Sequence, residues 1–195
     1  SSDQREAVLI NRNRVASAME VPPESLCAVH QVHSADVQVV TEASDDRPRA
    51  DAMVTNTPGL ALSILTADCQ PVLFSDPDAG VIGAAHAGWR GTLDGVLEAT
   101  LAAMEQLGAR RETTKAVIGP TISQRAYEVG PELFETFLSR DPSNARFFAQ
   151  GRGDRYLFDL PALGLHKLRE AGVQQAEWTR HCTYDDAARF YSYRR

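Results

Sequence analysis

The side chains best suited to chemistry are a thiol and an imidazole, Cys69 and His86, in two short stretches at 66–71 and 84–92. Cys69 follows an apolar run and stands in a polar corner, whereas a packing cysteine such as Cys27 usually lies within an apolar run. A thiol beside an imidazole forms either a metal site or a nucleophile with its general base. The residues alone leave both possibilities open.

A predicted hairpin brings this pair together. Residues 71–75 and 81–86 are expected to form antiparallel strands, because a turn-forming segment with Pro and Gly separates two apolar runs. We expect a register that sets Gln70 opposite His86, and directly opposed residues lie about 5 Å apart. Cys69 and His86 are therefore predicted to be near neighbours.

A third donor is available in His33. His30 and His33 face opposite sides of a predicted strand, so only one of them joins a given site, and His33 is at the exposed end. His33, Cys69 and His86 would form a set of two nitrogens and one sulfur with one position open. That set suits catalytic zinc, since structural zinc is usually enclosed by four protein ligands. The chain spacing matches no short zinc-finger pattern and does not establish the set by itself.

The glycine-rich segment 88–92 is a possible anion site. Its glycines allow a ligand to approach the backbone, and a helix that we expect to begin after Thr92 carries partial positive charge at its start. Arg90 offers a bidentate guanidinium for phosphate or carboxylate. Many glycine-rich turns only start helices, so this signal is less specific than the Cys69 and His86 pair.

The composition is that of a globular protein with one ordinary core. The chain has 195 residues, 43% of them hydrophobic and 24% charged, and a formal net charge of −6. This charge argues against nucleic acid or anionic membrane as a partner, and no apolar run is long enough to span a membrane. Three widely spaced cysteines favour a reducing compartment, so we expect a cytoplasmic protein. We expect one domain over 1–195, trimmed at both ends.

The order of predicted elements indicates an α+β fold. Hairpins dominate early and strands alternate with helices later, so we predict a three-layer α-β-α sandwich around one mixed sheet. The predicted strands lie at 26–32, 37–40, 52–55, 60–66, 71–75, 81–86, 116–118, 176–179 and 190–193, and the predicted helices at 7–19, 93–107, 131–139 and 161–171. Gly108 is expected to end the second helix in a left-handed conformation.

Several ordered motifs resemble one known family, the laccase-domain or polyphenol oxidase family, also called peptidoglycan editing factor. The resemblance covers essentially the whole chain. Its members are described as zinc-dependent purine nucleoside phosphorylases with adenosine deaminase activity. The motifs are QVHS at 31–34, ADAMVT at 50–55, TADCQPVL at 66–73, AHAGWRG at 85–91, IGP at 118–120, YEVG at 127–130 and CT followed by FYSYRR within 182–195.

The resemblance implies a metal triad at His33, Cys69 and His86, and purine nucleosides and inorganic phosphate as substrates. The copper-oxidase name fits less well, because multicopper oxidase sites need about ten histidine ligands. This chain has five histidines in all. Copper nevertheless remains the second choice of metal, since thiolate and imidazole ligands also suit it. The chain departs from the family in lacking an N-terminal strand and a glycine-rich tail, and in having Gly164 where Asn is expected.

Three functions stay open at this point. The first is a zinc-dependent purine nucleoside phosphorylase in which Arg90 binds phosphate. The second is a hydrolase or deamidase with Cys69 as nucleophile and His86 as its base. The third is a non-catalytic binding role in cell-wall precursor control, which no residue demands. The preferred purine and the oligomeric state do not follow from the residues.

Overall fold

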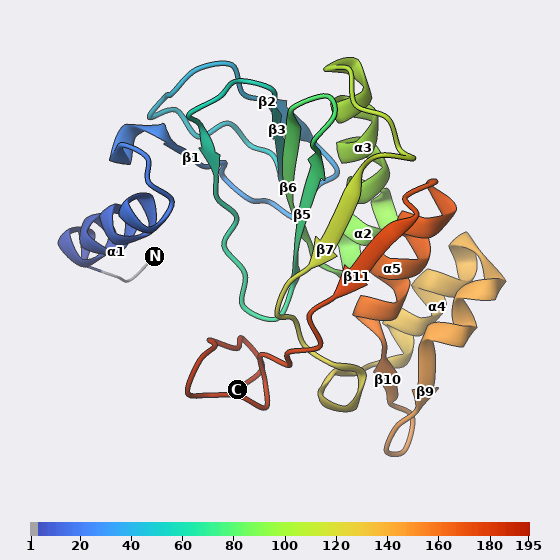
Figure 1. Cartoon of the computed structure of the whole chain (residues 1–195). Helices are drawn as coiled ribbons and strands as arrows, with labels where there is room; N and C mark the ends of the chain where they lie inside the picture. The colour runs from blue at the N-terminus through green and yellow to red at the C-terminus, as the bar shows by residue number, and fades with distance from the viewer. Residues whose placement is uncertain (1–3) are drawn as a thin grey trace.

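The computed structural model describes residues 4–195, and a six-stranded mixed sheet is its centre (Figure 1). The strand order is β11-β7-β5-β6-β3-β2, with β11 parallel to β7, β2 parallel to β3, and the other neighbours antiparallel. This confirms the predicted mixed sheet and α+β class. The strands are β2 (Val37–Val39), β3 (Ala52–Thr55), β5 (Gln70–Asp76), β6 (Val81–Ala87), β7 (Lys115–Ile118) and β11 (Gln175–Trp178).

Two helices, α3 (Val96–Gln106) and α5 (Leu160–Glu170), cover one face of this sheet. The alternation of side chains along β5 explains why: Val72 and Phe74 are buried towards the helices, while Leu73 points to the other face and is 57% exposed. The main core of the protein lies in this layer between sheet and helices.

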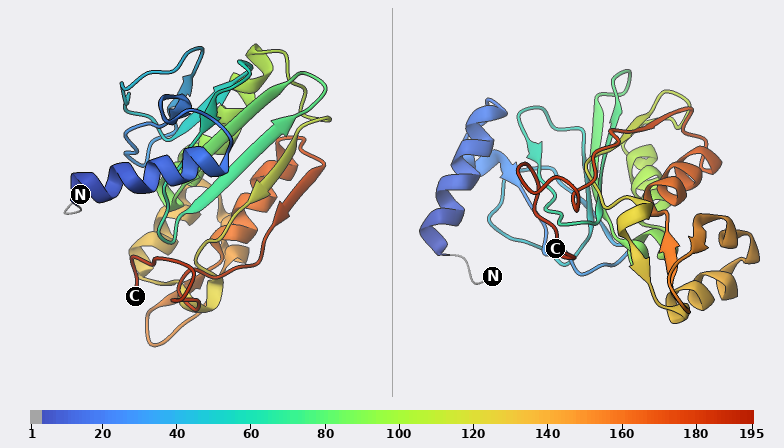
Figure 2. Two further views of the ribbon diagram at one scale, coloured as in Figure 1. Left: turned by 60° about the vertical axis from the view of Figure 1, so that its left-hand side comes forward. Right: turned by 90° about the horizontal axis from the view of Figure 1, so that it is seen from below.

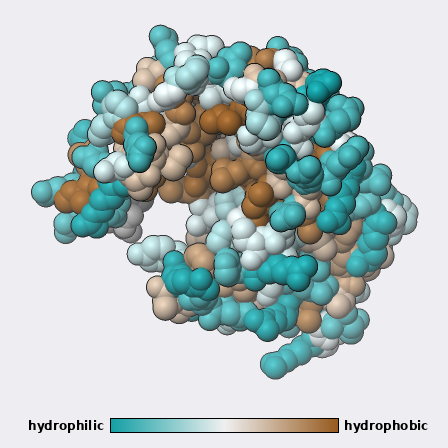
Figure 3. Space-filling model, in the orientation of Figure 1, coloured by the Kyte–Doolittle hydropathy of each residue, from teal (hydrophilic) through white to brown (hydrophobic). Residues whose placement is uncertain are grey.

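The second face is covered only in part. The short parallel pair β1 (Leu26–Cys27) and β4 (Ala61–Leu62) packs over β3, and helix α1 (Arg5–Ala18) lies beyond that pair (Figure 2). The space-filling view shows hydrophobic surface lining a hollow between α1 and the main sheet (Figure 3). Helices therefore lie on both sides of the sheet, but α1 is separated from it by the β1–β4 layer.

A smaller unit follows β7 and carries an aromatic core. It combines α4 (Pro131–Arg140) with a three-stranded sheet of order β8-β10-β9, namely β8 (Glu128–Val129), β10 (Tyr156–Phe158) and β9 (Phe148–Gln150). Three short 3-10 helices complete the elements, at Pro23–Ser25, Gln124–Ala126 and Pro142–Phe147. The rings of Phe137, Phe148 and Phe158 pack against one another within this unit.

The predicted hairpin exists, but its register was wrong by one residue. His86 lies opposite Pro71, and Gln70 lies opposite Ala87. The reason is the turn: the side chain of Asp76 accepts hydrogen bonds from the backbone of the turn that follows it, so Asp76 belongs to the strand and pairs with Val81.

The helix predicted after Thr92 was placed wrongly at its start. Helix α2 (Trp89–Asp94) begins directly after Gly88, and Thr92 is a buried residue within it. Gly95, with φ of +96°, separates α2 from α3, because a left-handed residue cannot continue a helix. Gly108, with φ of +101°, has the predicted left-handed conformation.

Three predicted strands differ most from the structure. The segments at 26–32 and 60–66 contain only the two-residue strands β1 and β4. Backbone groups in both segments bond to side chains rather than to a strand, Val32 to Asp51 and Leu65 to Gln31. The segment 190–193 is not a strand, and its Tyr191 and Tyr193 are largely exposed. Within the described residues, no helix is long and apolar enough to cross a membrane.

Candidate metal centre

The three predicted ligands meet at one end of the β5–β6 hairpin. Cys69 directly precedes β5, His86 is the penultimate residue of β6, and His33 comes from the loop before β2. One donor atom from each lies within 4.8 Å of the others. Cys69 Sγ is 3.9 Å from His33 Nε2, and the rings of His33 and His86 meet edge to face at 4.7 Å.

Asp51 organises two of these ligands, although it is not itself one of the three. This carboxylate is fully buried just before β3, and its Oδ1 lies 2.7 Å from His86 Nδ1. A carboxylate in this position holds the proton on Nδ1 and leaves Nε2 unprotonated, with a lone pair that can bind a metal. Histidine ligands of metals are usually supported in this way.

The same carboxylate shapes the loop that carries His33. The backbone N–H groups of Val32, His33 and Ser34 all donate to Asp51, at 2.7 to 3.0 Å, and the Ser34 hydroxyl adds a further bond. Three successive N–H groups aimed at one carboxylate require a tight bend, and His33 has φ of +61°. This conformation is costly outside glycine, so the hydrogen bonds of Asp51 offset strain at a ligand position.

Burial and neighbouring groups shift the pKa values of Asp51, His86 and Cys69. Burial opposes ionisation of Asp51, but hydrogen bonds from His86 and from the backbone of Ser34, Val32 and His33 hold its pKa below the ordinary value. Burial lowers the pKa of His86 despite the neighbouring Asp51, so the imidazole is neutral, as a ligand must be. Burial, with the charges of Asp68 and Asp51, raises the pKa of Cys69 to about 11.

Gly88 lies so close to Cys69 and His33 that no side chain fits at its position, and we call this contact the close wall of the cluster. A Cβ atom added there would lie 2.9 Å from Cys69 Sγ and 3.0 Å from His33 Cδ2. Its backbone is extended at φ −69°, a conformation open to any residue, so the contact alone demands glycine. The donor types, their convergence and this fitted space are consistent with a metal ion held by His33, Cys69 and His86.

A cavity of about 570 Å³ opens over the cluster. Trp89, Tyr127 and Tyr193 contribute aromatic surface to it, and Leu65 and Ile122 add apolar surface. Burial raises the pKa of Tyr127 to about 12, so its hydroxyl keeps its proton. The cavity is thus lined by the three potential metal ligands together with aromatic and apolar side chains.

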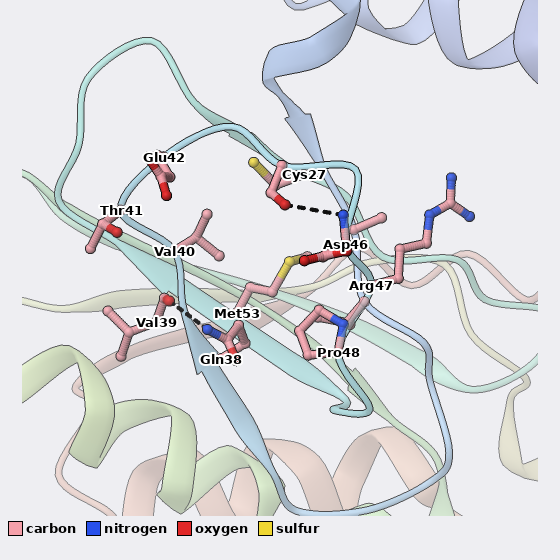
Figure 4. Close-up of a pocket in the computed structure, with 13 residues that line it drawn as sticks. Cys27, Gln38, Val39, Val40, Thr41, Glu42, Asp46, Arg47, Pro48 and Met53 are labelled. Atoms are coloured by element: carbon pink, nitrogen blue, oxygen red, sulfur yellow. Dashed lines mark hydrogen bonds between the residues drawn. The ribbon is translucent and has the colours of Figure 1, made fainter.

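A second cavity of about 520 Å³ is lined by residues of β1, β2 and β3, among them Cys27 and Met53 (Figure 4). Glu42, Asp46 and Arg47 stand at its edge. Burial raises the pKa of Cys27, which agrees with its predicted packing role. None of the three clustered ligands lines this second cavity.

Arg90 is the predicted site residue that does not line the cavity over the cluster. Its side chain is exposed, and its guanidinium lies over the ring of Trp89 at 5.3 Å. Sequence reasoning gave no role to Asp51, Asp68 or Arg194. The one signal for Asp51 in the sequence is its position, directly before the apolar segment 52–54. A carboxylate next to a buried strand is itself at risk of burial, and buried carboxylates are rare unless they have partners.

Together the mixed sheet and this cluster define a protein with three potential metal ligands beside an aromatic cavity. The chain belongs to the family described as multi-copper polyphenol oxidoreductase laccase, whose family model matches residues 1–195. The predicted family is therefore confirmed.

Curated relatives include the Escherichia coli protein named purine nucleoside phosphorylase YfiH, 39% identical over 99% of this chain and 77% of its own length. A Deinococcus radiodurans protein named purine nucleoside phosphorylase is 40% identical over 100% of this chain and 74% of its own length. A solved Neisseria meningitidis structure has a TM-score of 0.91 and 39% identity, covering 100% of this chain and 78% of its own.

Proposed function

We propose that this protein is a zinc-dependent purine nucleoside phosphorylase that also deaminates adenosine. The substrates would be inorganic phosphate and adenosine, inosine, guanosine or methylthioadenosine. The observation that carries the proposal is the convergence of His33, Cys69 and His86 on the floor of an aromatic cavity. The names of the relatives in Escherichia coli and Deinococcus radiodurans support the same activity.

In phosphorolysis, a phosphate oxygen forms a bond to C1′ of the ribose as the bond from C1′ to the purine breaks. The electron pair of the broken bond leaves with the purine, which takes up a proton, and the sugar leaves as the 1-phosphate. Zinc held by His33, Cys69 and His86 would supply a Lewis acid to this cavity. Copper is the less favoured metal for the same donors.

The protein's own side chains would bind and orient the nucleoside. Trp89, Tyr127 and Tyr193 would provide ring surface for the purine. Asp51 keeps the His86 ring in one orientation throughout.

Adenosine deamination would occur in the same cavity, with water replacing the amino group at C6 and ammonia leaving. This reaction needs no phosphate. Conversion of adenosine to inosine in phosphate-free buffer therefore measures the second activity separately from the first.

The hydrolase or deamidase with Cys69 as nucleophile and His86 as base is the second candidate. Asp51 bonded to His86 favours it, because a base held by a carboxylate is one feature of such sites. One observation favours the metal instead: a third donor, His33, joins the pair, which a nucleophile with its base does not need.

The test is a phosphate-dependence assay on inosine with elemental analysis of zinc and copper in the same protein. We expect about one zinc per chain and release of hypoxanthine only when phosphate is present. His86→Ala should abolish the reaction while circular dichroism shows a folded chain. Full activity in a metal-free protein, stopped by a thiol alkylator, would establish the hydrolase instead.

A further inference from the structure

We infer that Arg194 binds the phosphate co-substrate at the mouth of the cavity, and that Asp68 positions the segment that carries it. This inference rests on the proposed phosphorylase activity and assigns one of its substrates to a residue. It replaces the expectation from the sequence that Arg90 performs this role.

The placement of Arg194 is the first observation. It lines the cavity over the metal cluster, whereas Arg90 does not. Its guanidinium lies 5.0 Å above the ring of Tyr127, and its Nη1 donates to the carbonyl of Glu128 at 2.8 Å. These two contacts orient the guanidinium plane without neutralising its charge.

The charge of Arg194 is available to a ligand. Within residues 4–195, no carboxylate forms an ion pair with this guanidinium, and no other arginine or lysine lines the cavity. Its neighbour Arg195 is a contrast, because that guanidinium donates to the carbonyls of Thr183, Tyr184 and Phe190 and closes the loop. A free guanidinium beside an aromatic cavity suits a tetrahedral oxyanion.

Asp68 holds the segment 183–194 beside the cavity through hydrogen bonds. Its Oδ1 accepts from the hydroxyl of Thr183 at 2.6 Å, and its Oδ2 accepts from the hydroxyl of Ser192 and the backbone N–H of Arg194 at 3.0 and 2.8 Å. Asp68 is buried, and so is its bond to Thr183, while its bonds to Ser192 and Arg194 are partly buried. An irregular segment is thus held at both of its ends by one carboxylate.

Asp68 also connects this segment to the metal ligand. It directly precedes Cys69, its φ is +87°, and its carbonyl accepts from Ile122 N and Thr121 Oγ1. With the backbone held in this conformation, the Asp68 side chain reaches the 183–194 segment while Cys69 Sγ joins the cluster. Phosphate at Arg194 and a nucleoside over the cluster would therefore lie in one continuous cavity.

The experiment measures the KM for inorganic phosphate at saturating inosine in the full zinc-loaded chain, together with calorimetric binding of phosphate alone. We expect Arg194→Gln to raise the phosphate KM and Kd by about 10- to 100-fold, with a smaller change in kcat and unchanged zinc content. Arg194→Lys should recover part of the loss, because it restores the charge without the fork. Arg152→Gln, an exposed arginine in the turn between β9 and β10, is the matched control.

Ser192→Ala tests the positioning by Asp68, since it removes one bond to that carboxylate and leaves the Cys69 stretch intact. We expect a rise in phosphate KM of about 2- to 10-fold with kcat preserved.

An active Arg194→Gln protein with an unchanged phosphate KM would overturn the inference, as would a rise found instead in Arg90→Gln. An unchanged KM in Ser192→Ala would overturn the positioning role. A wild-type protein that shows no phosphate-dependent cleavage would instead contradict the proposed function itself.

Discussion

Asp51 and Asp68 are two buried carboxylates close to the same metal cluster, and they hold two different parts of the site. Asp51 collects hydrogen bonds from the 32–34 loop and from His86, which carry metal ligands. Asp68 accepts hydrogen bonds from Thr183, Ser192 and Arg194, in the segment whose Arg194 lines the cavity. One carboxylate therefore holds the candidate metal ligands, and the other holds the segment at the mouth of the cavity.

The two carboxylates also share a feature, since each accepts hydrogen bonds from a neighbouring segment that has no regular secondary structure. Both neighbouring segments are irregular, so their N–H groups lack strand partners and must bond elsewhere. A buried carboxylate accepts several such groups at once, because its two oxygens offer about four acceptor positions. This explains why rigid loops can carry functional groups here without being strands or helices.

The largest effect is expected from Asp51→Asn, which breaks the metal side of this comparison. The amide presents a donor to N–H groups that need acceptors, so we expect about 3 kcal/mol less stability. Zinc affinity should fall by about 10- to 100-fold, as for other supports of histidine ligands. Denaturant unfolding and a chelator competition measure the two effects, and Asp36→Asn, an exposed neighbour, is the control. Unchanged zinc affinity would show that Asp51 does not orient His86.

Gly88→Ala tests the cluster by space rather than by charge. The added methyl collides with Cys69 Sγ and the His33 ring, while the backbone at this position accepts any residue. We expect zinc affinity to fall by about tenfold with little change in the unfolding midpoint. Gly83→Ala is the matched control: its Cβ meets Met104 in the core, so it should lower stability and leave zinc binding intact. Equal zinc affinity in both variants would refute the close wall.

Asp68→Asn sharpens the comparison, because its effect should be confined to the substrate side. We expect the 183–194 segment to become more sensitive to limited proteolysis, at least severalfold, while zinc content stays near that of the wild type. Mass spectrometry of the fragments locates the cuts. Zinc loss without faster cleavage would mean that Asp68 supports the metal ligand instead.

A third buried aspartate, Asp76, gives the smallest effect and lies at the far end of the hairpin. Its pKa lies below the ordinary value, chiefly because the backbone N–H of Arg110 donates to it. Burial opposes this shift, and hydrogen bonds from Thr113 and the turn N–H groups add to it. A lowered pKa contributes stability above the unfolded value of about 3.9, and this contribution is lost as the pH falls below it. Unfolding midpoints from pH 6 to pH 3 should therefore fall more steeply in the wild type than in Asp76→Asn, with zinc binding equal in both at pH 7.

Local patterns predicted the elements that depend on local physics. Strands at 52–55 and 71–75 were predicted from short apolar runs bounded by turn signals, and the helices near 131–139 and 161–171 from proline at their first turn. The proximity of Cys69 and His86 followed from the hairpin, although the register differed by one residue. His33 entered the set mainly through family resemblance, because its left-handed conformation leaves no periodic signal.

The sequence by itself determined the mixed sheet, the hairpin and the pair of Cys69 with His86. Apolar runs, turn residues and the pairing of strands joined by a short turn depend on residues that are close together in the chain. Only the tertiary structure decided the role of Asp68, whose partners Thr183 and Arg194 are 115 and 126 residues away along the chain. It likewise decided that Arg194, and not Arg90, lines the cavity. The physical reason is that side-chain hydrogen bonds depend on distance in space, and a buried carboxylate takes whichever donors the folded chain brings to it.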